Sequence, residues 1–271
     1  MEKYVERITQ NNPCLIIILI DQSCSMDDFY GNTNKQKKEL IALNANKVIY
    51  EILEASSNGE YIKNIFFISA ISYGNTFGVD LILGDFINNI DEKILRIEKI
   101  KRKLPDGIGG LIEIDEDFPI WIEPKAECSS SMDIAFKRAY ELCEKWVKYN
   151  KDSFPPLIIN IVGGMPSHIE NTKLEAKKLM KLSNNDGNVL LLNLYIVDGL
   201  TNSIIFPHNN NMLPNNTSKF LYTISSILPD TLINEANRSG LSTNNKAKGF
   251  IYDGNAEMFI RLLSFGSSVA R

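Results

Sequence analysis

The sequence of 271 residues is poor in the residues and motifs on which most enzyme active sites depend. It contains two histidines, His168 and His208, and both lie close to prolines in stretches typical of surface loops. It has no G-x-S-x-G nucleophile elbow, no H-E-x-x-H zinc site and no G-x-x-x-x-G-K-[ST] phosphate loop. We therefore do not expect the protein to be an enzyme.

The four cysteines exclude a further class of site. They show no CxxC spacing, and four in a chain of this length are too few for a disulfide scaffold. Cys14 opens an apolar stretch, and Cys143 falls on the apolar face of an expected helix. We interpret both as reduced residues of the core.

Neither a strong positive charge nor a long apolar run is present. The net charge is -4 and the pI is near 5.4, which argues against a nucleic-acid partner. The longest basic cluster, KIKRK at 99–103, is interpreted as the end of a solvated helix. The apolar run Leu15–Ile20 is far shorter than the roughly 20 residues that span a membrane. The polar N-terminal stretch MEKYVERITQNNP is unlike a signal peptide, so we expect a cytoplasmic protein without a membrane partner.

The patterns that are present alternate between strands and helices. This alternation predicts one α/β domain over residues 1–271, with a core from about 13 to 262 and a doubly wound, mostly parallel sheet. Residues 14–20 are continuously apolar, as in a strand covered on both faces. Further strands are expected at 62–74, 79–88, 155–164, 187–197 and 250–252, and helices at 36–56, 91–103, 172–182, 217–227, from 132 and from 256.

Residues of about 105–124 interrupt this alternation. The stretch LPDGIGGLIEIDEDFPIWIEP is punctuated by glycine and proline and predicts a β-hairpin insertion. Its acidic run is interpreted as the solvated face of the hairpin. Phe118 and Trp121 are candidates for binding a partner, although the hairpin could simply cover the edge of the sheet.

The first strand ends in Asp21-Gln22-Ser23-Cys24-Ser25. Alternate residues of an extended turn can direct the hydroxyls of Ser23 and Ser25 to one place while Asp21 supplies negative charge. Such oxygen ligands suit Mg²⁺ or Mn²⁺. An ordinary Ser/Asp helix cap would use the same residue types. Two other polar loops, SSSMD and GGMPSH, are expected at the same edge of the sheet, where ligands of doubly wound folds bind.

Asp21 to Met26 resembles the start of the metal-ion-dependent adhesion site of von Willebrand factor A domains. The resemblance covers most of the chain, including LIDQSCSM, LPDGIGG, FPPLIINIVGG, DGNVLLLNLYI, ISSILP and KGFIYD. It looks especially like a group of bacterial cytoplasmic single-domain members related to tellurite-resistance and stress-response proteins. It implies a Rossmann-like fold and a role in protein–protein interaction.

The resemblance also implies a degenerate metal site. Ser130 occupies the position at which members of the family have a threonine ligand. Gly163 stands where they have an aspartate. Losing such a carboxylate costs roughly 10–100-fold in metal affinity. Asp27 and Glu127 are the acidic residues considered as replacements.

The implied function is partner binding, with Asp21, Ser23, Ser25 and Ser130 holding a cation that accepts a partner's Asp or Glu. A serine/threonine kinase or a metal-dependent phosphatase is the implied partner, in stress signalling or phage defence. Two alternatives stay open. One is a metal-independent scaffold with an inactive site, and the other is a Mg²⁺-dependent phosphoester hydrolase, which would need a second acidic cluster near Asp21.

Overall fold

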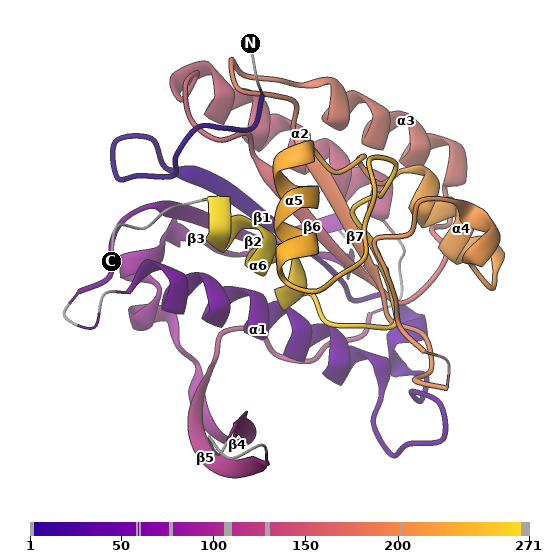
Figure 1. Cartoon of the computed structure of the whole chain (residues 1–271). Helices are drawn as coiled ribbons and strands as arrows, with labels where there is room; N and C mark the ends of the chain where they lie inside the picture. The colour runs from indigo at the N-terminus through magenta and orange to yellow at the C-terminus, as the bar shows by residue number, and fades with distance from the viewer. Residues whose placement is uncertain are drawn as a thin grey trace.

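The computed structural model describes residues 3–57, 59, 61–75, 78–105, 110–127, 131–200 and 202–266, without the side chains of 102–105, 111 and 264–266. A seven-stranded sheet forms its centre, in the order β3-β2-β1-β6-β7-β9-β8 (Figure 1). The strands are β1 (Cys14–Asp21), β2 (Phe66–Asn75), β3 (Gly78–Phe86), β6 (Leu157–Val162), β7 (Leu190–Tyr195), β8 (Ile204–Ile205) and β9 (Phe250–Tyr252). The helices are α1 (Lys37–Ser56), α2 (Met132–Tyr149), α3 (Ile169–Lys181), α4 (Asn216–Thr223), α5 (Asp230–Arg238) and α6 (Glu257–Gly266).

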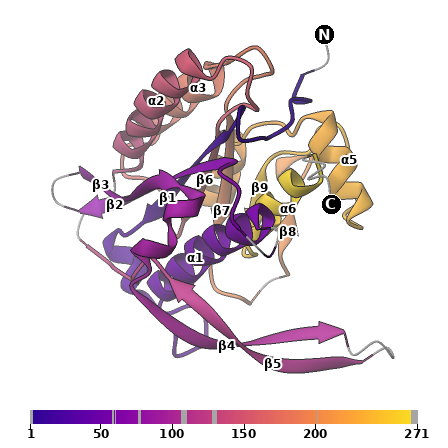
Figure 2. The same ribbon diagram turned by 90° about the vertical axis from the view of Figure 1, so that its left-hand side faces the viewer.

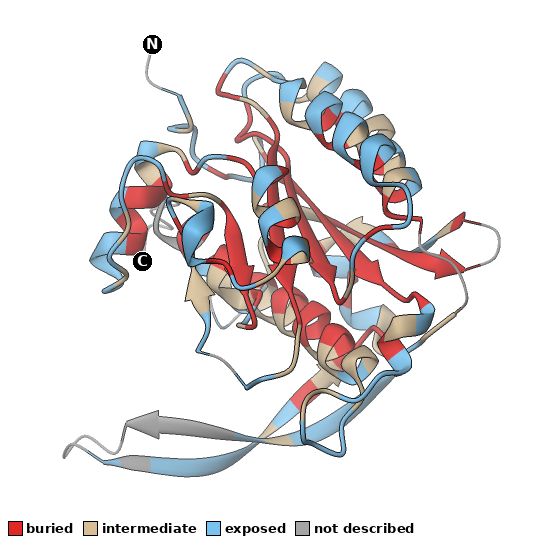
Figure 3. Ribbon diagram, turned by 90° about the vertical axis from the view of Figure 1, so that its right-hand side faces the viewer, coloured by how far each residue is buried: buried red, intermediate tan, exposed pale blue. Residues whose placement is uncertain are grey.

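The sheet is mixed and mostly parallel, as the alternation of strands and helices predicted. Strands β2, β1, β6, β7 and β9 run parallel, while β3 and β8 pair antiparallel at the two edges. Helices α2 and α3 cover one face, and α1 and α6 cover the other (Figure 2). Because both faces are covered, every residue of β1 is buried, which explains its unbroken apolar run (Figure 3).

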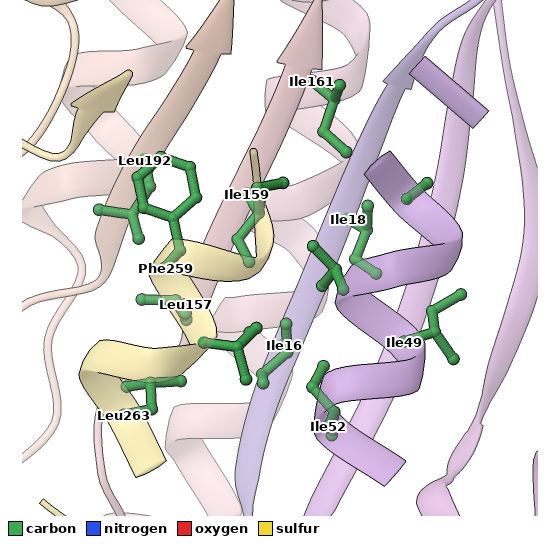
Figure 4. Packing of buried hydrophobic residues seen from close by; sticks show 14 of the residues in the cluster. Ile16, Ile18, Ile49, Ile52, Leu157, Ile159, Ile161, Leu192, Phe259 and Leu263 are labelled. Atoms are coloured by element: carbon green, nitrogen blue, oxygen red, sulfur yellow. The ribbon is translucent and has the colours of Figure 1, made fainter. Parts of the chain in front are cut away.

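The side of the core beneath α1 and α6 is filled by branched and aromatic side chains. Ile16 and Ile18 of β1 belong to the same buried cluster as Ile49 and Ile52 of α1 (Figure 4). From α6, Phe259 and Leu263 pack toward β6 and β7 in this cluster. In the described part of the molecule, no helix is both long enough and apolar enough to cross a membrane.

The hairpin insertion is present, but its boundaries differ from the prediction. Its strands are β4 (Arg96–Pro105) and β5 (Leu111–Ile120), so most of the helix expected at 91–103 is a strand. The register places Lys99 opposite Asp117, and their charged groups lie 3.8 Å apart. Lys99 and Lys101, interpreted above as part of a helix end, therefore pair with the acidic run of the partner strand.

Phe118 and Trp121, considered above as candidates for binding a partner, are buried, and this contradicts a direct contact with a partner. Their side chains are only 1% and 2% exposed. Phe118 packs edge-on against Tyr50 of α1, and the indole N–H of Trp121 donates to the carbonyl of Ile90 at 3.0 Å. Both aromatics fix the base of the hairpin to the domain because large rings gain most from burial.

A buried asparagine of α1 completes this attachment. Asn46 is 1% exposed, and its side-chain oxygen accepts from the backbone N–H groups of Trp121 at 2.8 Å and Ile122 at 3.0 Å. Its amide nitrogen donates to the carbonyl of Ile122 at 2.9 Å. The side chain of Asn46 thus provides hydrogen-bond partners for three backbone groups just after β5, where no neighbouring strand provides them.

We predict that Asn46→Leu lowers the free energy of unfolding by about 2–4 kcal/mol, because buried polar groups lose their partners. Urea unfolding of the whole chain measures this change. Asn171→Leu is the matched control, since Asn171 is an exposed residue of α3 and surface substitutions stay within about 0.5 kcal/mol. Equal stability of the two variants would contradict the proposed role of Asn46.

Candidate metal centre

The Asp-x-Ser-x-Ser turn lies where two central parallel strands end. Asp21 is the last residue of β1, and Gly163 directly follows the neighbouring strand β6. The backbone N–H of Gly163 donates to Oδ2 of Asp21 at 3.1 Å. The turn therefore occupies the carboxyl edge of the sheet, the usual ligand position of doubly wound folds.

The chain itself holds the carboxylate of Asp21 in one orientation. The backbone N–H of Ser23 donates to Oδ1 at 3.0 Å, and the Ser23 hydroxyl donates to the same oxygen at 2.7 Å. Together with Gly163, three donors surround a side chain that is 3% exposed. A buried carboxylate requires such donors because it has lost its hydration.

Burial raises the pKa of the Asp21 carboxyl above its usual value, because low polarity disfavours the charged form. The hydrogen bonds from Ser23 and Gly163, and the positive charge of Lys37, act in the opposite direction. The raised pKa shows that burial outweighs these donors.

The two serine hydroxyls lie side by side in front of this carboxylate. Oγ of Ser23 and Oγ of Ser25 are 3.4 Å apart, and Ser25 is half-buried at the start of a short 3-10 helix, Cys24–Asp27. Neighbouring ligands of an octahedral Mg²⁺ at its ordinary bond lengths lie about 3 Å apart. Because the Ser23 hydroxyl donates to Asp21, its lone pairs are available to a cation. Asp21, Ser23 and Ser25 therefore fit a hard divalent cation.

The other predicted site residues fare differently. Ser130 lies outside the described residues. The carboxylate of Asp27 is exposed and forms an ion pair with Lys38, with 2.6 Å between Oδ1 and Nζ. Its negative charge is therefore already compensated by a lysine. The backbone N–H of Glu127 donates to the carbonyl of Gln22 at 2.6 Å, so its segment runs beside the turn. Within the described ranges, no three His, Cys, Asp or Glu residues gather to hold a metal ion.

Met26 is a site residue that the sequence reasoning missed. It is fully buried, and a Cβ built on Gly163 would lie 2.5 Å from its sulfur and 3.4 Å from Cδ1 of Ile41. The space in which a side chain at position 163 would begin is therefore filled by a thioether. Only the spatial pairing of β1 with β6 reveals this contact.

Gly74 is a second missed residue, at the end of β2. Its φ of +129° suits glycine, and a Cβ there would lie 2.4 Å from the carbonyl carbon of Gln22. The backbone N–H of Gln22 donates to the carbonyl of Tyr73 at 2.8 Å. Gly74 thus allows β2 to approach the turn that carries the serines.

No protein-family model matches the sequence, and no curated protein matches it. Solved structures do resemble it. The manganese-loaded TRAP protein of Plasmodium vivax is 12% identical with a TM-score of 0.47, over 93% of this chain and 72% of that one. VWA2, the ArnB paralog of Sulfolobus acidocaldarius, is 16% identical with a TM-score of 0.31, over 67% of this chain and 34% of that one.

The PilB minor pilin of Streptococcus sanguinis is 8% identical with a TM-score of 0.46, over 94% of this chain and 60% of that one. The chain thus spans less than two thirds of both VWA2 and this pilin. The fold is α/β, with a mixed, mostly parallel sheet and a hairpin. The tellurite-resistance subgroup and the degenerate metal site stay predictions.

We predict that Gly163→Ala and Met26→Ala are not additive. Gly163→Ala alone forces the buried end of the Met26 side chain to move, and this shift costs about 0.5–1.5 kcal/mol of unfolding free energy. In the double variant the shortened side chain at 26 leaves room for the new methyl, so a coupling of about 0.5–3 kcal/mol is expected. Urea unfolding of the four members of the cycle measures this coupling, and strict additivity would contradict the contact.

Proposed function

We propose that the chain is a non-enzymatic interaction domain that binds a protein partner at the carboxyl edge of its sheet. A divalent cation, Mg²⁺ or Mn²⁺, would be held there by Ser23 and Ser25, with Asp21 supplying negative charge. The observation that supports this proposal is the pair of adjacent hydroxyls, 3.4 Å apart, beside a carboxylate fixed by three donors.

When bound, such a cation would supply concentrated positive charge for an Asp or Glu of the partner. The residues of this chain position the groups that would hold the cation. Gly163 and the backbone of Ser23 hold Asp21 in place, and Asp21 orients the Ser23 hydroxyl. Because position 163 carries no carboxylate, the resident ligand set is low in charge and affinity is expected to be weak until a partner's carboxylate joins.

A metal-independent interaction domain is the second candidate, and the packing of Met26 favours it. A buried thioether lies where a side chain at 163 would begin, so this side of the turn is apolar. The phosphoester hydrolase gains no comparable support, because the described residues place no second acidic cluster with Asp21.

The biological setting belongs to the same proposal. The resemblance of the sequence supports a cytoplasmic, bacterial protein of the tellurite-resistance and stress-response type, with a serine/threonine kinase or a metal-dependent phosphatase as partner. Stress signalling or phage defence would be the process served.

We predict that the chain binds Mn²⁺ and Mg²⁺ weakly in calorimetric titration, and more tightly when N-acetyl-aspartate is present as a carboxylate probe. Ser25→Ala should lower the Mn²⁺ affinity at least tenfold through the loss of a ligand. Because Ser25 is half-buried at the surface of the turn, its removal should leave stability within about 0.5 kcal/mol.

Ser239→Ala, an exposed serine that follows α5, is the matched control and should bind as the unaltered chain does. Absence of binding with and without N-acetyl-aspartate would overturn the metal-dependent proposal in favour of the metal-independent candidate. Unchanged affinity of Ser25→Ala would contradict the assignment of that ligand.

We also predict a pH dependence of Mn²⁺ binding. A cation and a proton compete for Asp21, so affinity should fall as pH is lowered through its pKa. Because burial raises this pKa above 3.8, the loss should begin at a higher pH than for an exposed aspartate. Calorimetry across an acidic pH series tests this. An unchanged pH profile in Asp21→Asn would show that another group is responsible.

A further inference from the structure

A hollow lies at the same edge of the sheet as the candidate metal centre. Its volume is about 310 Å³, close to the lower limit for ligand pockets, which is about 300 Å³. It is lined by Gln22 of the turn after β1, by Ser72 of β2, by residues of β3, and by the chain on either side of the hairpin. The hollow therefore adjoins the turn that carries the two serines.

The side chain of Gln22 is the unusual feature of this lining. The residue is only 5% exposed, yet its amide makes no hydrogen bond within the part of the chain that the structure describes. Unlike the enclosed hydroxyl of Ser69, the polar atoms of this amide retain accessible surface. Gln36 differs, because its amide nitrogen donates to the carbonyl of Asp27 at 2.9 Å. Buried amides normally have partners, so that of Gln22 is available to a bound molecule.

Exposed apolar side chains surround this amide. Leu81 and Ile82 of β3 and Leu95, which precedes β4, line the hollow and are exposed, Leu95 to 59%. Strand β3 is the last strand on this side of the sheet, so no further strand of the described chain pairs with it (Figure 2). Apolar side chains that gather on an open surface are typical of sites that bind another protein.

The charges around the hollow indicate what kind of segment fits. Glu123 is paired with Arg96, and Asp80 accepts from the side-chain amide of Asn75. Lys125 is exposed and has no ion pair within the described residues. Its positive charge is complementary to the Asp or Glu expected of the partner. The hollow itself suits an uncharged, aliphatic side chain.

The chemistry of the amide identifies the rest of the occupant. The side chain of Gln22 offers an N–H donor and a carbonyl acceptor in one plane. Each main-chain amide of an extended protein segment also carries one donor and one acceptor. A peptide group beside an aliphatic side chain therefore satisfies both the amide and the apolar lining.

We propose that this hollow receives an aliphatic side chain from an extended segment of the protein partner, with a main-chain amide of that segment bonded to Gln22. The inference rests on the proposed function only in taking the occupant to be a protein. It does not depend on the cation, because no side chain assigned to the metal centre lines the hollow. Occupancy can therefore be tested without a divalent metal.

The test uses N-acetyl-leucine methylamide, a leucine between two peptide groups, and ¹H–¹⁵N spectra of the full chain in EDTA. The side-chain NH₂ signal of Gln22, identified by its loss in Gln22→Met, should shift saturably with the probe. The NH₂ signal of Gln36, whose amide is already bonded within the chain, should stay in place. No saturable shift, or an equal shift of both amides, would overturn the proposal.

Two further probes separate the side chain from the peptide groups. N-acetyl-glycine methylamide lacks the aliphatic side chain and should bind at least tenfold more weakly, because it buries little apolar surface. 3-Methylbutan-1-ol carries the same branched chain without peptide groups and should bind at least threefold more weakly. If either probe binds as well as the leucine compound, the hollow does not recognise a protein segment and the proposal fails.

Gln22→Met distinguishes a binding role of the amide from a structural one. The variant keeps the length of the side chain and should weaken binding of N-acetyl-leucine methylamide by roughly threefold to tenfold, the value of one hydrogen bond. The backbone N–H signal of Ser72 reports this titration. The melting temperature should not fall, because the amide has no partner in the free chain. A lower melting temperature with unchanged affinity would overturn the proposal.

Leu95→Ala tests the apolar lining, and Leu174→Ala is its matched control. Both leucines are more than half exposed, but Leu174 belongs to α3, which does not line the hollow. Leu95→Ala should weaken binding of the leucine compound at least threefold, whereas Leu174→Ala should bind it as the unaltered chain does. Equal affinity of the two variants would contradict the proposed contact.

These measurements stay separate from the test of the metal centre. Because the probe is titrated in EDTA, a chain that fails to bind Mn²⁺ can still bind the probe, and the reverse also holds. Sedimentation of the full chain reports on the remaining occupant. A dimer that Leu95→Ala dissociates would assign the hollow to a second copy of this chain and overturn the proposal.

Discussion

The carboxylate of Asp21 sets the requirements that the surrounding loops meet. It carries charge at the end of a strand whose other residues are apolar and buried, and it lies among three central strands. Ser23 and Gly163 supply donors, and Gly74 allows a close approach of the backbone. The turn, which continues into the 3-10 helix Cys24–Asp27 rather than staying extended, is therefore held in a shape that brings the two serine hydroxyls together.

Helix α1 connects this turn to distant parts of the chain. Before its first residue, the Gln36 side chain donates to the carbonyl of Asp27 at 2.9 Å, which links the helix to the serine-bearing segment. Farther along, Asn44 accepts from the backbone N–H of Ala256 at 2.9 Å, just before α6, and Asn46 holds the hairpin base. Polar side chains of α1 and of the residue before it thus fix three segments by directional hydrogen bonds, which the non-directional hydrophobic effect does not supply.

The sequence predicted correctly those elements whose structure depends on residues that are close together in the chain. The apolar run 14–20 and the stripe of α1 depend on residues that are close in sequence. Strand β4 was missed because Ile97 and Ile100 follow helical spacing, while pairing with the acidic β5 decides the structure. Helix α3 begins at Ile169 rather than at 172, and Thr172 is a buried residue inside it. Only part of the candidate metal site could be predicted from the sequence. Asp21, Ser23 and Ser25 form one short motif, whereas Met26 and Gly163 meet only in the folded chain.

The contact between Gly163 and Met26 also constrains how this sequence can change over evolutionary time. A carboxylate at position 163 has to enter a space that a fully buried methionine already fills. Substitution at 163 before 26 passes through an overpacked intermediate, and substitution at 26 before 163 passes through one with a cavity. Each order of events passes through a less well-packed intermediate, so a change at either position alters the stability cost of a change at the other.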